Sequence, residues 1–108
     1  MAFNITDNTK CGVIGYGSWA TALVHTLVKN KVHVWWHIRN EEVMESLLTE
    51  GINAKYLSDI EFDQNYISPV SDINEVVRNT EVILIATPSA FLKNVMADLT
   101  ESLADKFI

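Results

Sequence analysis

The chain has 108 residues, of which 48% are hydrophobic, enough for one domain with a buried core. Its formal net charge is -6 and its eight Lys and Arg residues are scattered, which argues against binding to nucleic acid or to an anionic membrane surface. The longest apolar stretch, residues 82–86, is too short for membrane insertion, and the single Cys11 excludes a disulfide framework and is typical of a cytoplasmic protein.

The first predicted strand and helix follow a polar segment, residues 1–9, which shows no signal peptide and which we expect to be loosely attached. Residues 10–14 are typical of a buried strand, and we interpret Cys11 as a small buried hydrophobe within it. The strand ends in Gly-x-Gly. A helix is then predicted over residues 18–30, where apolar side chains recur at helical spacing: Ala20, Leu23, Val24, Leu27 and Val28.

The glycine turn carries the first functional signal, because strand, turn and helix in this order are the context in which Gly-x-Gly-x-x-Gly/Ala binds a dinucleotide. Gly15 permits the tight turn, Gly17 lets the backbone approach a pyrophosphate, and Ala20 is small enough for the helix to pack on the strand. Backbone N–H groups from Ser18 onward would face an anion at the positive end of the helix. We expect Trp19 to be covered by the cofactor or by a neighbouring domain. An ordinary structural turn is the alternative.

The remaining chain alternates strands and helices. We predict strands at 32–37, 66–70 and 81–86, and helices at 41–50, at 73–78 and from 89 onward. Residues 52–65 form an irregular loop, and loops of this length are often functional. Gly51 is predicted to end the second helix, and Ser71-Asp72 to cap the third. The continuous apolar run 81–86 indicates a central strand covered on both faces. The helix from 89 has its apolar stripe at Phe91, Leu92, Val95, Met96 and Leu99.

This order predicts an α/β fold, a Rossmann-like doubly wound parallel sheet. Residues 10–108 would be a dinucleotide-binding domain. Residues 105–108 resemble the approach to a fifth strand that is cut off at Ile108, so we expect the domain to be incomplete.

The end of the second strand is where such a fold selects its cofactor. An acid there binds the ribose 2′-OH of NAD, whereas an arginine accommodates the 2′-phosphate of NADP. Arg39 stands at this point and no acid precedes Glu41, so NADPH is favoured, with NAD or both cofactors left open. A solvated surface arginine is the alternative for Arg39. Pro88 and Ser89, at the carboxyl edge of the sheet, would lie beside the ribose and nicotinamide, unless Ser89 serves only as helix capping.

The other chemistry-bearing side chains suggest neither a metal site nor a catalytic set. His33 and His37 are four residues apart on a strand, and no acid or cysteine completes a set of metal ligands. We interpret His25 and His33 as structural, and His37 as a candidate for the adenine end of a cofactor. Trp35 and Trp36 should pack on opposite faces of the sheet. No catalytic residue is identified.

Residues 13–23, Val-Ile-Gly-Tyr-Gly-Ser-Trp-Ala-Thr-Ala-Leu, resemble the Gly-x-Gly-Ser-Trp-Gly-Thr-Ala-Leu signature of the NAD(P)-dependent glycerol-3-phosphate dehydrogenases. Residues 53–57 are similar to the Asn-x-x-Tyr-Leu-Pro loop of this family, and residues 86–89 to its Val-Pro-Ser turn. Arg39 falls where the family often has Arg or His. The resemblance extends over nearly the whole chain from Lys10 onward, with Ala20 in place of the third glycine and Ser58 in place of the loop proline.

The resemblance implies that Ser18, Trp19 and Arg39 bind a nicotinamide dinucleotide, with Tyr56 as a further contact. The whole enzyme would interconvert sn-glycerol 3-phosphate and dihydroxyacetone phosphate, a small phosphorylated substrate, in glycerophospholipid precursor synthesis. We expect the family's catalytic lysines and its helical second domain downstream of Ile108, and therefore expect the chain alone to be inactive. Whether the protein forms a homo-oligomer is left open.

Two alternatives stay open at the level of the sequence. One is the nucleotide-binding half of a related hydroxy-acid or sugar-acid dehydrogenase. The other is a nucleotide-sensing module without chemistry.

Overall fold

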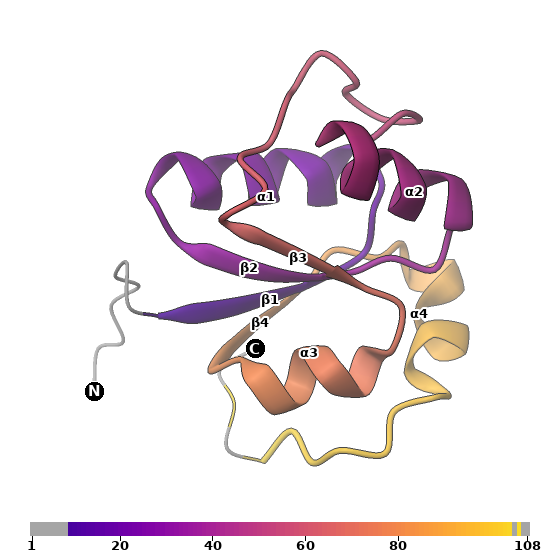
Figure 1. Ribbon diagram of the computed structural model, residues 1–108. Coiled ribbons are helices and arrows are strands. Elements are labelled where there is room, and N and C mark those ends of the chain that lie inside the picture. Colours follow the sequence, from indigo (N-terminus) through magenta and orange to yellow (C-terminus); the bar gives the residue numbers. More distant parts are fainter. Residues whose placement is uncertain (1–8, 105, 107–108) are drawn as a thin grey trace.

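The computed structural model describes residues 9–104 and residue 106 (Figure 1). Within them the strands are β1 (Lys10–Ile14), β2 (His33–His37), β3 (Ile67–Val70) and β4 (Val82–Ile85). The helices are α1 (Ser18–Lys29), α2 (Glu41–Glu50), α3 (Ile73–Asn79) and α4 (Ser89–Met96). Every element predicted for these residues is present.

The four described strands form one parallel sheet in the order β3-β2-β1-β4. The chain moves outward from β1 to β2 and β3 and then crosses back over β1 to reach β4. Helices α1 and α2 cover one face of the sheet, while α3 and α4 lie on the other (Figure 1). The predicted Rossmann-like, doubly wound sheet is therefore confirmed. Because Ile14 pairs with both His37 and Ile85, the carboxyl ends of β1, β2 and β4 are level at one edge.

Each face of the sheet has its own apolar core. Under α1 and α2, the fully buried Trp36 packs in a cluster that also holds Val13, Ala20 and Val24. The small side chain of Ala20 lets α1 approach the sheet, as expected. The cluster on the other face joins the sheet to α3 and α4, and its buried members are Ile14, Ile73, Val77, Ile83 and Val95. Removing water from both faces is the main stabilising term of the fold.

The caps of the helices follow local chemistry. Asn40 precedes α2 and accepts a hydrogen bond from the Val43 N–H at 3.0 Å, while Gly51 ends the helix with φ at 73°. Asp72 caps α3 by accepting from the Asn74 N–H at 2.9 Å. The predictions for Gly51 and Asp72 are confirmed.

The strand at 81–86 was predicted to be central, and this prediction is wrong for the described residues. There β4 pairs with β1 alone, so it is an edge strand and its Leu84 and Ile85 are only half-buried. Its continuous apolar run comes from contact with both core clusters.

The predictions for the two ends of the chain fall largely outside the described residues. The loosely attached segment is described only at Thr9, which is buried. The predicted start of a fifth strand, up to Ile108, is described at Lys106 alone, which lies in no strand. The predicted incompleteness of the domain at Ile108 therefore stays a prediction.

The apolar stripe predicted for the last helix is also corrected. Helix α4 ends at Met96, so Leu99 lies beyond it, although Leu99 still packs on the cluster under α3. Only Val95 of α4 is buried, and Phe91 is 59% exposed. The helix sits at the end of the sheet rather than over its middle, and it meets the core only near its own end, through Val95 and the half-buried Met96 (Figure 1).

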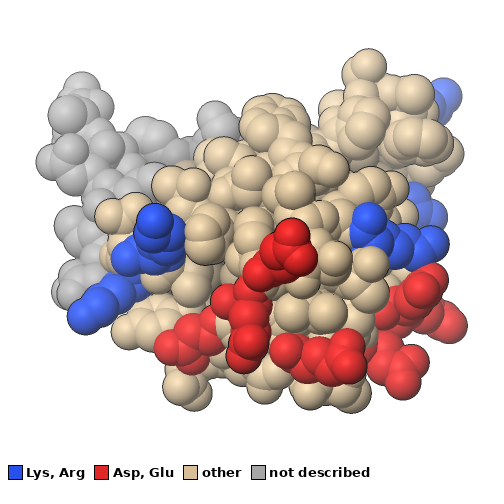
Figure 2. Space-filling view, turned by 90° about the horizontal axis from the view of Figure 1, so that it is seen from above, with Lys and Arg blue, Asp and Glu red and all other residues tan. Residues whose placement is uncertain are grey.

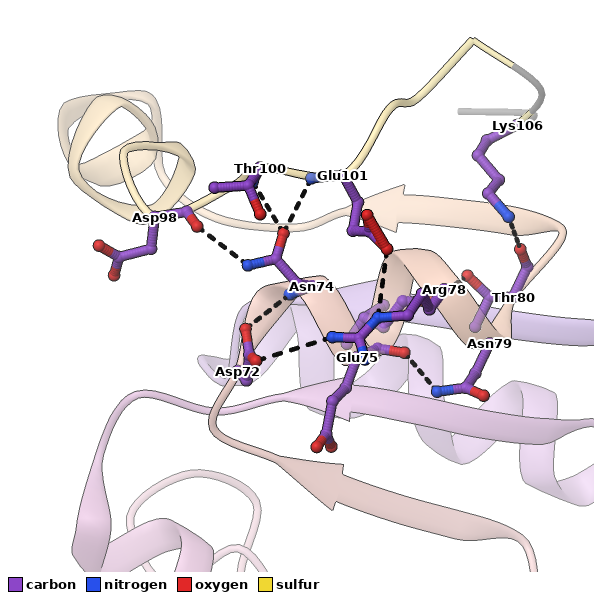
Figure 3. A network of polar contacts seen from close by, with 11 residues as sticks. Asp72, Asn74, Glu75, Arg78, Asn79, Thr80, Asp98, Thr100, Glu101 and Lys106 are labelled. Carbon is purple, nitrogen blue, oxygen red and sulfur yellow. Dashed lines mark hydrogen bonds and ion pairs between the residues drawn. The ribbon is translucent and has the colours of Figure 1, made fainter.

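Asn74 on α3 ties down the segment that follows α4 (Figure 3). Its amide nitrogen donates to the Asp98 carbonyl at 3.1 Å, and its oxygen accepts from the N–H groups of Thr100 and Glu101 at 2.8 and 3.0 Å. Arg78 adds an exposed ion pair to Glu101 at 3.2 Å. These contacts fix the end of α4 against α3.

We expect Asn74→Ala to lower the free energy of unfolding by about 1.5 kcal/mol, because two backbone N–H groups and one carbonyl lose their partner. Urea unfolding measures the change. The control is Asn79→Ala, which removes one exposed bond to the Glu75 carbonyl, 2.7 Å long, and should change stability by less than about 0.5 kcal/mol. Equal stability of the two variants would show that the hydrogen bonds of Asn74 to the segment after α4 do not stabilise the fold.

Candidate functional site

A pocket of ≈ 230 Å³ opens at the carboxyl edge of the sheet, across the ends of β1, β2 and β4. It lies where the chain reverses its direction of travel across the sheet, and open α/β sheets bind ligands at such switch points. The pocket is lined by Gly15, Tyr16, Gly17, His37, Arg39, Tyr56, Thr87, Pro88, Phe91 and Val95.

Five of the nine residues predicted to bind a cofactor line this pocket: Gly15, Gly17, Arg39, Tyr56 and Pro88. The other four lie beside it. Ser18 and Ser89 are exposed first residues of α1 and α4, Ala20 is buried beneath the turn, and Trp19 is 65% exposed. The cap position of α4 is occupied by Pro88, which makes no side-chain hydrogen bond, so Ser89 does not cap this helix.

The two glycines of the turn have different roles. Gly15 has φ at 128°, and a Cβ there would clash with the Ala86 carbonyl oxygen. Gly17 has extended backbone, and a Cβ there would have no atom within 4 Å. The first turn of α1 has neither a side-chain cap nor an acidic residue. Its leading N–H groups are therefore free to bind an anion.

Trp36 anchors the turn from below. Its indole N–H donates to the Gly15 carbonyl at 2.5 Å, within the core. Trp35 lies on the other face of the sheet, as predicted, with its ring 4.5 Å from the His33 ring. The hydrogen bond of Trp36 to the turn was missed. Size and hydrophobicity predict burial, but only the fold shows which carbonyl the indole meets.

Asn53 ties the long loop after α2 to the glycine turn. It is fully buried, and its amide nitrogen donates to the Tyr16 carbonyl at 2.8 Å and to the Thr21 hydroxyl at 3.0 Å. Its oxygen accepts from the N–H groups of Lys55 and Tyr56, both at 3.1 Å. Tyr56 is thereby held at the pocket, with its ring centroid 6.4 Å from that of Tyr16.

Arg39 stands at the rim, just beyond β2, and forms no ion pair with any residue in the described part of the chain. It also borders a second pocket of ≈ 390 Å³ along α2, where Glu41 and Glu45 form part of the wall. A guanidinium that is exposed and not paired in this way can take up a phosphate or another planar anion.

The histidines differ in their surroundings. His37 lines the pocket while only 4% exposed, and burial lowers the pKa of its ring below the ordinary 6.5. His33 bonds the Ser68 hydroxyl at 2.8 Å, and burial lowers its pKa as well. His25 lies edge-on to Phe62, with the ring centroids 6.3 Å apart. Across the residues described, no group of three His, Cys, Asp or Glu side chains could hold a metal ion.

Four lining residues were not predicted for the cofactor site or were given another role: Tyr16, Thr87, Phe91 and Val95. Tyr16 and Thr87 follow β1 and β4 so closely that their position alone would have suggested them. Helical periodicity assigned Phe91 and Val95 to one apolar stripe. Val95 is buried in the core and also lines the pocket, whereas Phe91 is exposed. That pattern does not distinguish a core from an apolar pocket wall.

The surface shows no basic patch on the side of α1 and α2, where acidic side chains gather along one edge and the Lys and Arg groups of described residues lie apart (Figure 2). None of the helices in the described ranges has the length and apolar character to cross a bilayer.

Cys11 is buried, and burial raises the pKa of its thiol, with the Glu81 carboxylate adding to this effect. Such burial is typical of a structural cysteine.

Comparison with known proteins points to one family. The family model for the N-terminus of NAD-dependent glycerol-3-phosphate dehydrogenase matches residues 10–108. Glycerol-3-phosphate dehydrogenase (NAD(P)+) from Treponema denticola is 36% identical over 94 residues, 85% of this chain and 26% of that protein. The enzyme of the same name from Limosilactobacillus reuteri is 32% identical over 96 residues, 89% of this chain and 28% of that protein.

Solved structures show the same fold. The crystal structure of glycerol-3-phosphate dehydrogenase from Coxiella burnetii matches with a TM-score of 0.76 and 24% identity, over 93% of this chain and 31% of that one. The enzyme from Saccharomyces cerevisiae matches with a TM-score of 0.74 and 23% identity, over 91% of this chain and 30% of that one. The chain thus spans less than a third of the length of these relatives.

Proposed function

Because the chain belongs to the NAD-dependent glycerol-3-phosphate dehydrogenase family, we propose that residues 10–108 of this protein are a dinucleotide-binding domain. The observation that carries this proposal is the pocket at the carboxyl edge. The glycine turn and Arg39 line it, and the leading N–H groups of α1 follow directly after the turn. A phosphate-rich ligand satisfies these donors together.

The binding mode follows from the donors. The pyrophosphate would lie on the first turn of α1, over Gly17, Ser18 and Trp19, with Ala20 packed beneath. Tyr56 and Pro88 would border the ligand from the loops on either side, and Ser89 would offer its hydroxyl at the start of α4. These roles are part of the proposal.

Arg39 supports a preference for NADPH over NADH, since the position just beyond the second strand is where a ribose 2′-phosphate lies in this fold. We expect Arg39→Ala to weaken NADPH binding by about tenfold to hundredfold, the loss of one charge-assisted contact, and to change NADH binding less than about twofold. Isothermal titration calorimetry with both cofactors measures this.

The matched control for that titration is Lys29→Ala, which also removes one exposed positive charge but lies at the far end of α1. It should leave both affinities unchanged. If Arg39→Ala weakened NADH and NADPH equally, the 2′-phosphate role would be excluded.

The whole protein would interconvert sn-glycerol 3-phosphate and dihydroxyacetone phosphate, and the bound nicotinamide would supply or accept the hydride. We place no catalytic residue among residues 1–108, and we propose that those acting on the substrate lie downstream of Ile108. Mixed with NADPH and dihydroxyacetone phosphate, the chain alone should leave the absorbance of NADPH unchanged. Steady oxidation of NADPH would overturn this part of the proposal.

Assembly and location complete the proposal. Trp19 and Phe91 are 65% and 59% exposed, and such apolar side chains beside a site are typical of surfaces that another domain or a second copy covers. We therefore propose that the protein forms a homo-oligomer. A cytoplasmic location is supported by the single, buried Cys11.

A further inference from the structure

Two carbonyl groups of the glycine turn point into the protein, where two buried side chains hold them. Asn53 donates from its amide nitrogen to the Tyr16 carbonyl at 2.8 Å. Thr21 donates from its hydroxyl to the Gly17 carbonyl at 2.7 Å, and its N–H donates to the same carbonyl at 2.9 Å. Both side chains are fully buried, so these two peptide groups of the turn are fixed from the inside of the fold.

The orientation of these carbonyls sets the direction of the N–H groups that follow them. In a planar trans peptide the carbonyl and the next N–H point in opposite directions, and the described residues contain no cis peptide bond. Because the Tyr16 and Gly17 carbonyls face the buried side chains, the N–H groups of Gly17 and Ser18 face away from them. Neither N–H has an acceptor among the described residues, and the space over Gly17 is open. The proposed function, on which this inference rests, places the pyrophosphate there.

The Asn53 amide is held in one orientation, because all of its hydrogen-bonding capacity is used. Its nitrogen also donates to the Thr21 hydroxyl at 3.0 Å, and its oxygen accepts from the N–H groups of Lys55 and Tyr56, both at 3.1 Å. An amide turned over would point its oxygen at the Tyr16 carbonyl and its nitrogen at two N–H groups, and such a buried mismatch is costly. The loop after α2 and the glycine turn therefore have one fixed arrangement.

We propose that Asn53 is a positioning residue of the cofactor site, which acts from the loop after α2 through the backbone of the glycine turn. It orients the Gly17 N–H directly, and the Ser18 N–H through Thr21, towards the pyrophosphate before the cofactor binds. Donors that are already in place bind a ligand without the cost of ordering the turn. Without Asn53 the peptide between Tyr16 and Gly17 is free to rotate, and cofactor binding must then restore its orientation.

The test compares two variants that loosen the same loop, Asn53→Ala and Ser46→Ala. The buried Ser46 hydroxyl accepts from the Ala54 N–H at 3.2 Å and donates to the Val43 carbonyl at 2.9 Å, so it holds the loop without touching the turn. We expect Asn53→Ala to weaken NADPH binding about tenfold, and Ser46→Ala to change it less than about twofold. Isothermal titration calorimetry measures the affinities, and urea unfolding should show that both variants are less stable than the wild type.

A ligand without a pyrophosphate separates positioning from a general loosening of the fold. Adenosine 2′-monophosphate carries the 2′-phosphate that we assign to Arg39, but it has no group that would reach the glycine turn. We expect its affinity, measured by NMR titration, to be the same in Asn53→Ala and in the wild type. Equal weakening of both ligands in Asn53→Ala would overturn the positioning role. An unchanged affinity of this variant for NADPH would overturn it too, and would leave the proposed function intact.

Thr21 provides the deciding comparison if circular dichroism shows that Asn53→Ala does not fold. Thr21→Val keeps the shape of the side chain but loses the hydroxyl that holds the Gly17 carbonyl and accepts from Asn53, so NADPH binding should weaken about fivefold. Thr21→Ser keeps the hydroxyl and should bind NADPH as the wild type does. Equal affinities of these two variants would overturn the inference. Failure of the wild-type chain to bind NADPH would overturn the proposed function and this inference together.

Discussion

We expect Gly17→Ala to weaken NADPH binding about hundredfold while leaving the fold intact, because one methyl group at a filled contact costs up to about 3 kcal/mol. The free chain has room for it: the backbone of Gly17 is extended and nothing lies within 4 Å of the new Cβ. The space is open because it lies over the first turn of α1, where the proposed pyrophosphate sits.

Calorimetry and urea unfolding separate the two effects, and the free energy of unfolding should change by less than about 0.5 kcal/mol. The opposite pattern is expected for Gly51→Ala at the end of α2, where φ is 73°. That variant should lose about 1–2 kcal/mol of stability and keep its affinity. Normal NADPH binding by Gly17→Ala would mean that the turn does not touch the cofactor.

Gly15→Ala should lower the free energy of unfolding by about 4 kcal/mol, the sum of backbone strain and a steric clash. At φ 128° an alanine is strained in any surroundings, and its Cβ would clash with the Ala86 carbonyl oxygen. Neither side can easily move, because the Ala86 N–H donates to the Ile14 carbonyl at 2.8 Å and Trp36 holds the Gly15 carbonyl. Such a loss is a large fraction of the stability of a small domain.

Thermal and urea unfolding of Gly15→Ala and the wild type test this directly. A loss below about 1 kcal/mol would show that the turn can shift away from β4, and that the close approach of the two loops is not required for stability. The two glycines should thus separate: one is needed for folding, and the other for binding.

Much of the fold could be predicted because its signals are local. Asp72 and Gly51 set helix ends through their own backbone and side-chain chemistry, and Ala20 sits three residues after Gly17, where α1 meets the sheet. The glycine turn was recognisable for the same reason. A strand, a turn and a helix that are contiguous in sequence form it.

The rest of the site depends on contacts between distant segments. The sequence shows that residues 81–86 are apolar, but whether β4 is a central or an edge strand depends on which strands pair with it in the sheet. His37 and Val95 meet in one pocket although they lie on different elements, and helical periodicity, which correctly predicted that Val95 is buried, gave no sign that it also lines a pocket. The bond of Trp36 to Gly15 likewise joins two segments that only the folded sheet brings together.

Binding of a nicotinamide dinucleotide by the glycine turn and the pocket beside it is tested most directly by titrating the ¹⁵N-labelled chain with NADPH and following the amide chemical shifts. We expect the largest shifts at Gly15, Gly17, Ser18 and Arg39, whose backbone borders the proposed pyrophosphate and ribose sites. Unmoved resonances of the turn at saturating NADPH would contradict this function for the domain.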